Sequence, residues 1–216
     1  ADLHDYSLLR ARVKAPQIGF SWLKALEALW ECLLFDDATT SFVSVDQREA
    51  SEKVLYAKKA YDGLPRPFQD WIPIVKNSQD EFSVGSENRP SRVMSIPATS
   101  ALRGRKMSVV IDEADFHQDA GKGSFRTAIG RITRGGRVSI GSTVFGEDTQ
   151  LDQIMKGIGD DDQELEQAKL FSKAQFPHTV AENEYVKKIV AIARETLAPD
   201  DYAEEYECVR GGYGMT

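Results

Sequence analysis

The sequence predicts an α/β fold with a mainly parallel sheet flanked by helices, followed by a small helical linker subdomain. Short β-type runs alternate with segments of helical period, which indicates successive strand and helix units. Two compact apolar runs in the second half are typical of strands buried on both faces. Polar clusters follow three of the predicted strands, and in open parallel sheets ligands bind at such carboxyl ends.

Composition limits the class of protein. The 216 residues, 41% hydrophobic and 28% charged with a net charge of -7, are typical of one globular domain and exclude collagen, a disordered tail and a disulfide scaffold. The longest run without a charged residue, 93–102, is far shorter than the roughly 20 residues of a membrane-spanning helix. The separated Cys32 and Cys208 favour a reducing, intracellular compartment and are expected to be plain thiols. Because the chain begins without Met or a signal pattern, we expect a further segment upstream.

The first predicted unit is a strand, a loop and a helix. Leu8–Val13 is a partly β-branched run, and Pro16 and Gly19 break the segment that follows. From Ser21, placed at the helix start, apolar residues recur every three or four positions. The predicted buried face carries Trp22, Leu23, Leu26, Trp30, Leu33 and Leu34, and all three tryptophans, Trp71 included, are expected in the core.

A second unit of the same kind follows. The run 41–45 predicts a strand, and a helical period then runs through Ala50, Val54, Ala57 and Tyr61 until Gly63-Leu64-Pro65 ends it. Between residues 65 and 100 the alternating pieces Phe82–Val84 and Arg92–Ile96 fit a hairpin or edge strands.

The second half predicts two central strands and an appendage. Met107–Ile111 leads into Asp112-Glu113-Ala114-Asp115, and after a helix over 125–134 the strand Val138–Ile140 ends in Gly141-Ser142-Thr143. The acidic run 160–162 is interpreted as a solvated loop, and helices are expected over 182–197 and 200–208. We expect a core domain over residues 1–165 and a linker subdomain over 166–216.

The loop between the first strand and helix is a candidate phosphate site. Such a loop offers free backbone N–H groups and the positive end of the helix dipole. In the common pattern G-x-x-x-x-G-K-S/T, Lys14 would stand first and Gly19 sixth. Phe20 replaces the lysine, and Ser21 stands last. Lys14 could supply the missing cation if its stem folds back; the alternative is a connection that merely starts a helix.

Acidic and hydroxyl residues follow the two central strands. Asp112 could hold Mg²⁺, and Glu113 could orient and deprotonate the water that attacks a γ-phosphate. Ser142 and Thr143 could sense that phosphate by hydrogen bonding to the water or to Glu113. The alternatives are a strand that emerges into solvent and ordinary turn residues.

Several arginines are candidates for contacts with phosphate, whereas the three histidines are not. Arg103 and Arg105 precede the strand that carries Asp112, and four more arginines crowd into twelve residues: Arg126, Arg131, Arg134 and Arg137. One could act as an arginine finger and others could contact nucleic-acid phosphate, although a solvated basic face is the alternative. His4, His117 and His178 lie far apart without ligand spacing, so none is assigned to metal or catalysis.

These segments resemble a known family. Lys14–Ser21 resembles the deviant Walker A loop of tailed-phage terminase large subunits, some of which carry the phosphate-binding lysine at the start of the loop. Val109–Phe116 is similar to their Walker B, and Gly136–Thr143 to the strand that leads to their coupling motif. Arg103-Gly104 also fits. The three motifs occur in the family's order and span nearly the whole chain.

The resemblance implies a RecA-like P-loop NTPase of the ASCE type, the ATPase of a motor that uses ATP and Mg²⁺ to pump double-stranded DNA into a procapsid. It implies a ring, usually of five subunits, docked on the portal protein in the host cell cytoplasm, with a small terminase subunit as partner and no membrane. By position the phosphate-binding residues are Lys14, Gln17, Ile18, Gly19, Phe20 and Ser21. Ser21 and Asp112 would hold the metal, Glu113 would be catalytic, and Ser142 and Thr143 would couple hydrolysis to movement.

Three departures from the family pattern matter. Gln17 stands where many relatives have arginine, which shifts the expected catalytic arginine to Arg103, acting on a neighbouring subunit. Little chain precedes the loop, so the adenine-binding motif is expected upstream. Because the chain stops shortly after 206–208, we expect no nuclease domain and no nuclease activity.

Two rival functions remain open. Asp112–Asp115 spells DEAD, as in a helicase, but a helicase of that kind needs a Gly-Lys-Thr loop and a second motor domain. Because Phe20 replaces the usual lysine, a non-catalytic P-loop scaffold is the other alternative. Hydrolysis would separate a motor from a scaffold, and duplex translocation against strand separation would separate it from a helicase.

Overall fold

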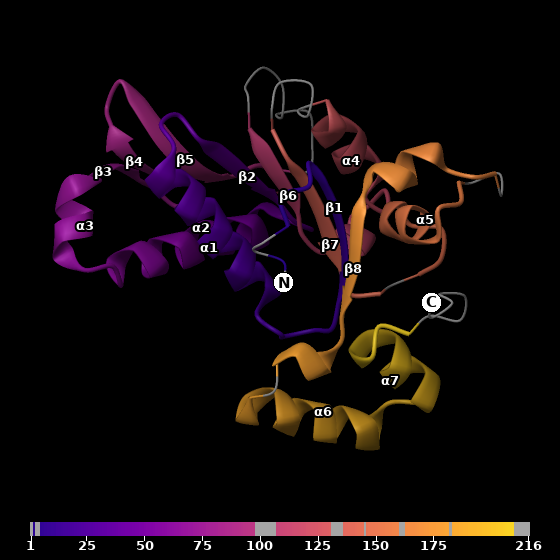
Figure 1. Cartoon of the computed structure of the whole chain (residues 1–216). Helices are drawn as coiled ribbons and strands as arrows, with labels where there is room; N and C mark the ends of the chain where they lie inside the picture. The colour runs from indigo at the N-terminus through magenta and orange to yellow at the C-terminus, as the bar shows by residue number, and fades with distance from the viewer. Residues whose placement is uncertain are drawn as a thin grey trace.

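A computed structural model describes residues 2, 5–97, 107–130, 136–144, 146–159, 163–181 and 183–209. An eight-stranded sheet in the order β3-β4-β5-β2-β6-β7-β1-β8 forms its centre (Figure 1). The strands are β1 Leu9–Lys14, β2 Thr39–Val43, β3 Ile74–Asn77, β4 Glu81–Ser86, β5 Arg89–Ser95, β6 Ser108–Ile111, β7 Val138–Ser142 and β8 Ser172–Phe176. The helices are α1 Phe20–Leu34, α2 Gln47–Asp62, α3 Arg66–Trp71, α4 Lys122–Ile129, α5 Gln150–Lys156, α6 Glu184–Thr196 and α7 Pro199–Tyr206.

The sheet is parallel from β5 to β8 and ends in an antiparallel edge. β2 pairs in parallel with β5 and β6, and the parallel ladder continues through β7 and β1 to β8. β3 and β4 pair antiparallel and join the sheet through β5. The predicted fold class is therefore confirmed, and the predicted hairpin is formed by β4 and β5, although β5 lies inside the sheet.

Alternation along the strands divides the core into two layers. In β6, Val109 and Ile111 pack on the side of α4 and α5, whereas Val110 packs on the side of α1 and α2. Phe42 and Val43 divide β2 in the same way. The period of two along each strand therefore places one apolar layer on each face, as a sheet covered by helices on both faces requires.

The buried face of α1 differs from the predicted one. The helix buries three small residues, one lysine and two large apolar residues: Ala25, Ala28, Cys32, Lys24, Phe20 and Leu29. Trp22 and Trp30 are exposed, as is Trp71 in α3, so the prediction of three core tryptophans is wrong. Ser21 lies in the first turn of the helix, as predicted, and the helix begins one residue earlier, at Phe20 after Gly19. Short side chains on the buried face let α1 approach the sheet closely, and this face could not be identified from apolar period alone.

The second helix agrees with its pattern. Ala50, Val54, Ala57 and Tyr61 are all buried, and the Asp46 side chain caps the helix by accepting from the Glu49 N–H at 2.8 Å. The structure adds elements that the sequence analysis did not assign, namely α3, β3, α5 and β8.

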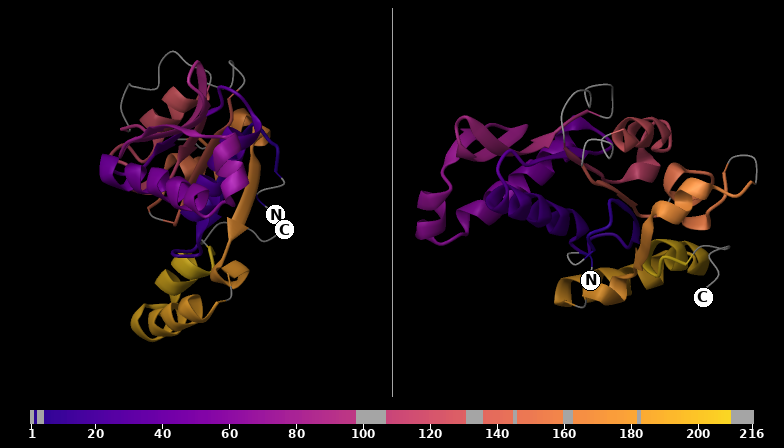
Figure 2. Two further views of the ribbon diagram at one scale, coloured as in Figure 1. Left: turned by 90° about the vertical axis from the view of Figure 1, so that its left-hand side faces the viewer. Right: turned by 45° about the horizontal axis from the view of Figure 1, so that its top comes forward.

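The last strand and the final helices lie beyond the predicted boundary at residue 165. The division of the chain there stays a prediction; the sheet itself continues to Phe176, because β8 pairs with β1. After β8, α6 and α7 pack on each other through Val186, Val190, Ala193 and Tyr202. Figure 2 shows this helical pair extending away from the body of the sheet. The acidic run 160–162 lies outside the described residues.

Two further expectations concern thiols and membranes. Cys32 and Cys208 are buried and unpaired, and burial raises the pKa of each thiol to about 12, as plain core thiols require. Among the helices within the described ranges, none has both the length and the apolar character needed to cross a lipid bilayer.

Candidate active site

The loop between β1 and α1 lies at the carboxyl edge of the sheet. It leaves β1 at Lys14 and is held against β8 by the Ala15 N–H, which donates to the Phe176 carbonyl at 2.8 Å. Gln17 and Gly19 take left-handed conformations, with φ of 58° and 84°, and turn the chain into α1. Among the described residues no side chain caps this 15-residue helix, so the N–H groups of its first turn are available to an anion.

Lys14 and Glu113 meet across the loop. The Lys14 Nζ lies 2.6 Å from Glu113 Oε1, and the two side chains are 5% and 27% exposed. Glu113 follows β6 in a left-handed conformation (φ 52°), which turns its side chain toward β1. Thr143, at the end of β7, donates from Oγ1 to Glu113 Oε2 at 3.3 Å. The ends of β1, β6 and β7 therefore contribute one cation, one carboxylate and one hydroxyl to the same place.

Ser21 and Asp112 form the second contact of the site. Ser21 Oγ donates to Asp112 Oδ2 at 2.7 Å, and the Glu113 N–H donates to Asp112 Oδ1 at 3.2 Å. Asp112 is only 1% exposed. A hydroxyl and a carboxylate in contact fit Mg²⁺, which uses one or two protein oxygens and completes its shell with water and phosphate. Among the described residues no group of three His, Cys, Asp or Glu side chains could hold a metal by itself.

Phe20 points away from the loop and into the core. Its ring lies 6.2 Å from the Phe176 ring and closely approaches Gly141, where an added Cβ would be 2.9 Å from the Phe20 Cε1 atom. The Lys14 Nζ is 6.0 Å from the ring centroid. The phenyl group therefore packs α1 on β7, and Lys14 supplies the cation of the loop. Ile18 packs partly on the core, whereas Gln17 is exposed.

Ser142 and Thr143 have different contacts. Thr143 reaches Glu113 directly, as noted above. Ser142 is fully buried, and its Oγ accepts from the Asp115 N–H at 3.3 Å. It thus fixes the 3-10 turn Ala114–Phe116 that follows Glu113, and only Thr143 is in contact with the carboxylate.

Two further residues lie beside Asp112: Lys53, which sequence reasoning missed, and His117, to which it assigned no metal or catalytic role. Lys53, on α2, is buried with its Nζ 3.4 Å from Asp112 Oδ2. His117 is buried too, with Nε2 3.0 Å from the Asp112 carbonyl oxygen and Nδ1 3.2 Å from Ser124 Oγ. Burial lowers the pKa of His117 and favours its neutral ring. Through its contacts with the Asp112 carbonyl and with Ser124, the ring joins the segment that follows β6 to α4. The burial of Lys53 could have been predicted from the sequence, because this residue lies between Ala50 and Ala57 on the apolar face of the predicted helix.

The arginines are only partly described. Arg103, predicted to be catalytic, lies outside the described residues, as do Arg105, Arg131 and Arg134. Arg126 is exposed on α4. Arg137 is paired with Glu31 and lies 3.8 Å from Glu27 Oε1, so its guanidinium serves α1.

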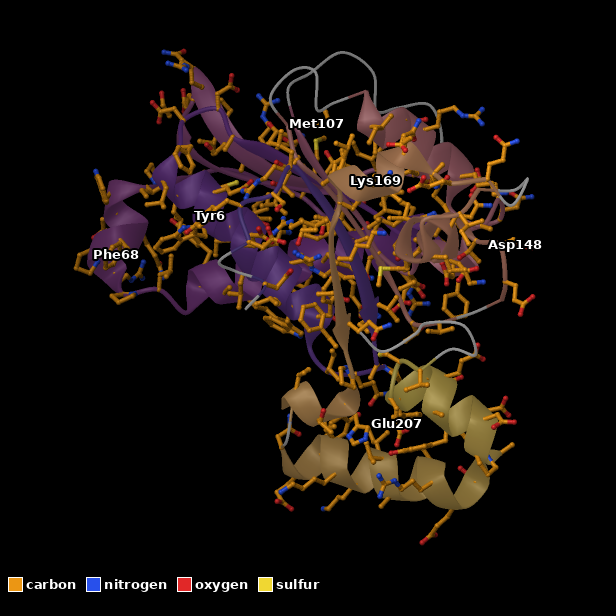
Figure 3. All side chains as sticks on the ribbon, turned by 45° about the vertical axis from the view of Figure 1, so that its right-hand side comes forward. Tyr6, Phe68, Met107, Asp148, Lys169 and Glu207 are labelled. Carbon is orange, nitrogen blue, oxygen red and sulfur yellow. The ribbon has the colours of Figure 1, made fainter. Side chains whose placement is uncertain are left out.

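A separate cavity of about 380 Å³ lies at the opposite edge of the sheet. Its lining includes Glu31, Asp36, Asp37, Met107 and Arg137. Figure 3 shows Met107 at this edge and Glu207, at the end of α7, on the side of the carboxyl ends. The three carboxylates disfavour a phosphate ligand there. The chemistry suited to a nucleotide is therefore at the loop and not in this cavity.

Comparisons with known proteins were made on sequence and on structure. No protein-family model matches the chain, and no curated protein is similar to it in sequence. Similar structures include the large terminase ATPase domain of Thermus phage P74-26, with a TM-score of 0.66 and 14% identity over 94% of this chain and 89% of that one. Another is the large terminase of a thermophilic bacteriophage in complex with ATP-gamma-S, with a TM-score of 0.63 and 9% identity over 93% of this chain. The chain spans 47% of that protein's length. The chain thus has the fold of large terminase ATPase domains.

Proposed function

We propose that this chain is the ATPase unit of a viral DNA-packaging motor, which hydrolyses ATP with Mg²⁺ to move double-stranded DNA into a procapsid. One observation carries the proposal: Lys14, Asp112, Glu113 and Thr143 converge from the ends of three adjacent parallel strands, where Ser21 joins them from the first turn of α1. The likeness to large terminase ATPase domains, one of them in complex with ATP-gamma-S, supports the choice of reaction and motor.

The site residues divide the work of phosphoryl transfer. The N–H groups at the start of α1 and the Lys14 ammonium would bind the phosphates, with Gln17, Ile18, Gly19 and Phe20 contributing backbone. Ser21 and Asp112 would hold Mg²⁺, which neutralises charge on the phosphates. Glu113 would accept a proton from the attacking water, and it can do so only after Lys14 exchanges its carboxylate for phosphate. Thr143 would report that exchange to β7.

The assembly is proposed on the same basis. A ring of subunits, a pentamer when docked on the portal protein, would act in the host cell cytoplasm with a small terminase subunit. Arg103 would act on the site of the neighbouring subunit. Ser142 would act together with Thr143 to couple hydrolysis to movement. We propose no nuclease activity for residues 1–216.

The test is ATP hydrolysis with Mg²⁺ at increasing protein concentration, with and without double-stranded DNA. We expect turnover to rise with concentration, because the neighbour completes the site. Lys14→Ala and Glu113→Gln are expected to lower turnover at least about a hundredfold, as loss of a phosphate-binding cation or a general base does. Lys76→Ala removes an exposed lysine on β3 and should leave turnover unchanged.

Binding and hydrolysis together separate the alternatives. Glu113→Gln should still bind ATP, and more tightly than the parent, because it releases Lys14. If the parent binds ATP but never hydrolyses it at any concentration or with DNA, the scaffold function replaces the motor. Strand separation without duplex translocation would favour the helicase.

A further inference from the structure

Lys53 is a buried lysine whose position the proposed reaction does not explain. It lies on the inner face of α2 with a side chain 7% exposed. Its ammonium contacts Asp112 Oδ2 at 3.4 Å and Ser44 Oγ at 3.5 Å. Removing an ammonium from water is costly unless a charged partner compensates, so this contact with the carboxylate is what keeps Lys53 in place.

The contact falls on one particular oxygen. Asp112 Oδ2 is also the atom that accepts from Ser21 Oγ, whereas Oδ1 accepts from the Glu113 N–H. A divalent cation held by Ser21 and Asp112 would bind at Oδ2. The Lys53 ammonium and a metal ion at this site would therefore contact the same carboxylate oxygen.

We propose that Lys53 is a positioning residue that competes with Mg²⁺ for Asp112 Oδ2. The inference rests on the proposed metal site at Ser21 and Asp112. Two cations at one oxygen repel each other, so Lys53 weakens the binding of bare Mg²⁺ while it keeps the carboxylate neutralised and in place. The metal then binds well only with a nucleotide, whose phosphates add the negative charge that offsets this repulsion. Lys53 makes the site select the metal–nucleotide complex.

The test measures binding of the metal alone. Mn²⁺ is titrated into the whole chain, and free Mn²⁺ is read from its electron paramagnetic resonance signal, with and without ADP. We expect Lys53→Met and Lys53→Gln to bind Mn²⁺ alone at least tenfold more tightly than the parent. We expect a smaller gain with ADP, because the phosphates already offset the ammonium.

Three variants control the measurement. Lys53→Arg keeps the cation and should bind Mn²⁺ like the parent. Lys59→Met removes an exposed lysine from the same helix and should also leave binding unchanged, which separates the local contact from net charge. Asp112→Asn should lose Mn²⁺ binding, both alone and when combined with Lys53→Met.

The outcomes are distinct. Unchanged or weaker Mn²⁺ binding by the folded Met and Gln variants overturns the role of Lys53. If neither variant folds in buffer, added Mn²⁺ should restore its circular dichroism spectrum by replacing the lost charge, and failure to do so also overturns it. If the parent and Asp112→Asn bind Mn²⁺ equally with ADP, the proposed metal site itself is wrong.

Discussion

Phe20 fills the position at which phosphate loops usually carry lysine, and its ring is buried against the backbone of Gly141. A Cβ added at Gly141 would lie 2.9 Å from Phe20 Cε1 and 3.1 Å from Cζ. The phenyl ring cannot move freely, because it is buried between Gly141 of β7 and Phe176 of β8. The glycine of β7 and the phenylalanine of α1 therefore depend on each other.

At the residue scale, Gly141→Ala is expected to lower the free energy of unfolding by about 1–3 kcal/mol, the usual effect of an added methyl in a packed core. Gly63→Ala is the matched control, since its Cβ would be at an ordinary 3.4 Å from the Ala60 carbonyl oxygen and its backbone is helical. Urea unfolding of both variants measures the difference. Equal stability of the two would show that the Phe20 ring yields to the methyl group.

At the scale of the element, α1 carries two apolar faces and buries only one. The face of Ala25, Ala28 and Leu29 packs on the sheet, while Trp30 is 61% exposed. Trp22 stacks on Tyr56 with ring centroids 4.3 Å apart. The helix is therefore oriented by its buried small residues and by Lys24, which pairs with Asp2 near the N-terminus and with Glu27 of the same helix.

Two leucines of α1 allow a matched test of this orientation. Leu29 is 3% exposed and Leu26 is 44% exposed. Leu29→Ala is expected to cost about 2–5 kcal/mol through lost burial and the cavity left behind. Leu26→Ala should change stability by no more than about 0.5 kcal/mol. Chemical unfolding checks both, and the reverse order would mean that α1 is rotated to bury its large residues.

At the scale of the whole molecule, a buried ionic network joins the N-terminal residues to the sheet. Arg12 on β1 contacts Asp2 at 2.5 Å, pairs with Asp5 and donates to the Ser172 carbonyl of β8 at 2.6 Å. Lys24 of α1 contacts Asp2 at 2.5 Å. Buried charges of this kind are costly to leave unpaired, so the network holds these segments in one arrangement.

The network makes the free energy of unfolding depend on pH in the acidic range. Burial alone would raise the pKa of Asp2, but the ion pairs with Lys24 and Arg12 outweigh it and hold that pKa below its usual value of 3.8. The pKa of Asp5 is also lowered: burial opposes the shift, and hydrogen bonds from Ser172, Ser7 and Arg12 outweigh it. Because the folded pKa is the lower one, this stabilisation is present above pH 3.8 and is lost as pH falls through the folded values.

Asp2→Asn therefore has a defined pH signature. The variant should be less stable than the parent at neutral pH, and its stability should fall less steeply between about pH 5 and about pH 2. Urea midpoints across that range measure the slope, with the exposed Asp36→Asn as the control. Parallel slopes for all three proteins would show that Asp2 is not paired in the folded state.

Much of the fold and part of the site could be predicted from the sequence. The β6 and β7 runs and the period of α2 predicted buried elements, because strong local patterns leave few alternatives. The proximity of Lys14, Asp112, Glu113 and Thr143 was predicted, because polar residues at strand ends converge in a parallel sheet. The strand β8 was not predicted, since Ser172–Phe176 has little apolar pattern and becomes a strand by pairing with β1.

The sequence by itself determined the central strand and helix units, the apolar layers of the central strands and the edge at which the polar residues collect, since these depend on local period and on the direction of the chain. Only the tertiary structure decided which face of α1 is buried, that Phe20 packs on Gly141, and that Lys53 and His117 adjoin Asp112. The reason is physical: apart from the local contact of His117 with Asp112, these contacts join segments far apart in the chain. Close packing and charge pairing select them only after the sheet has formed.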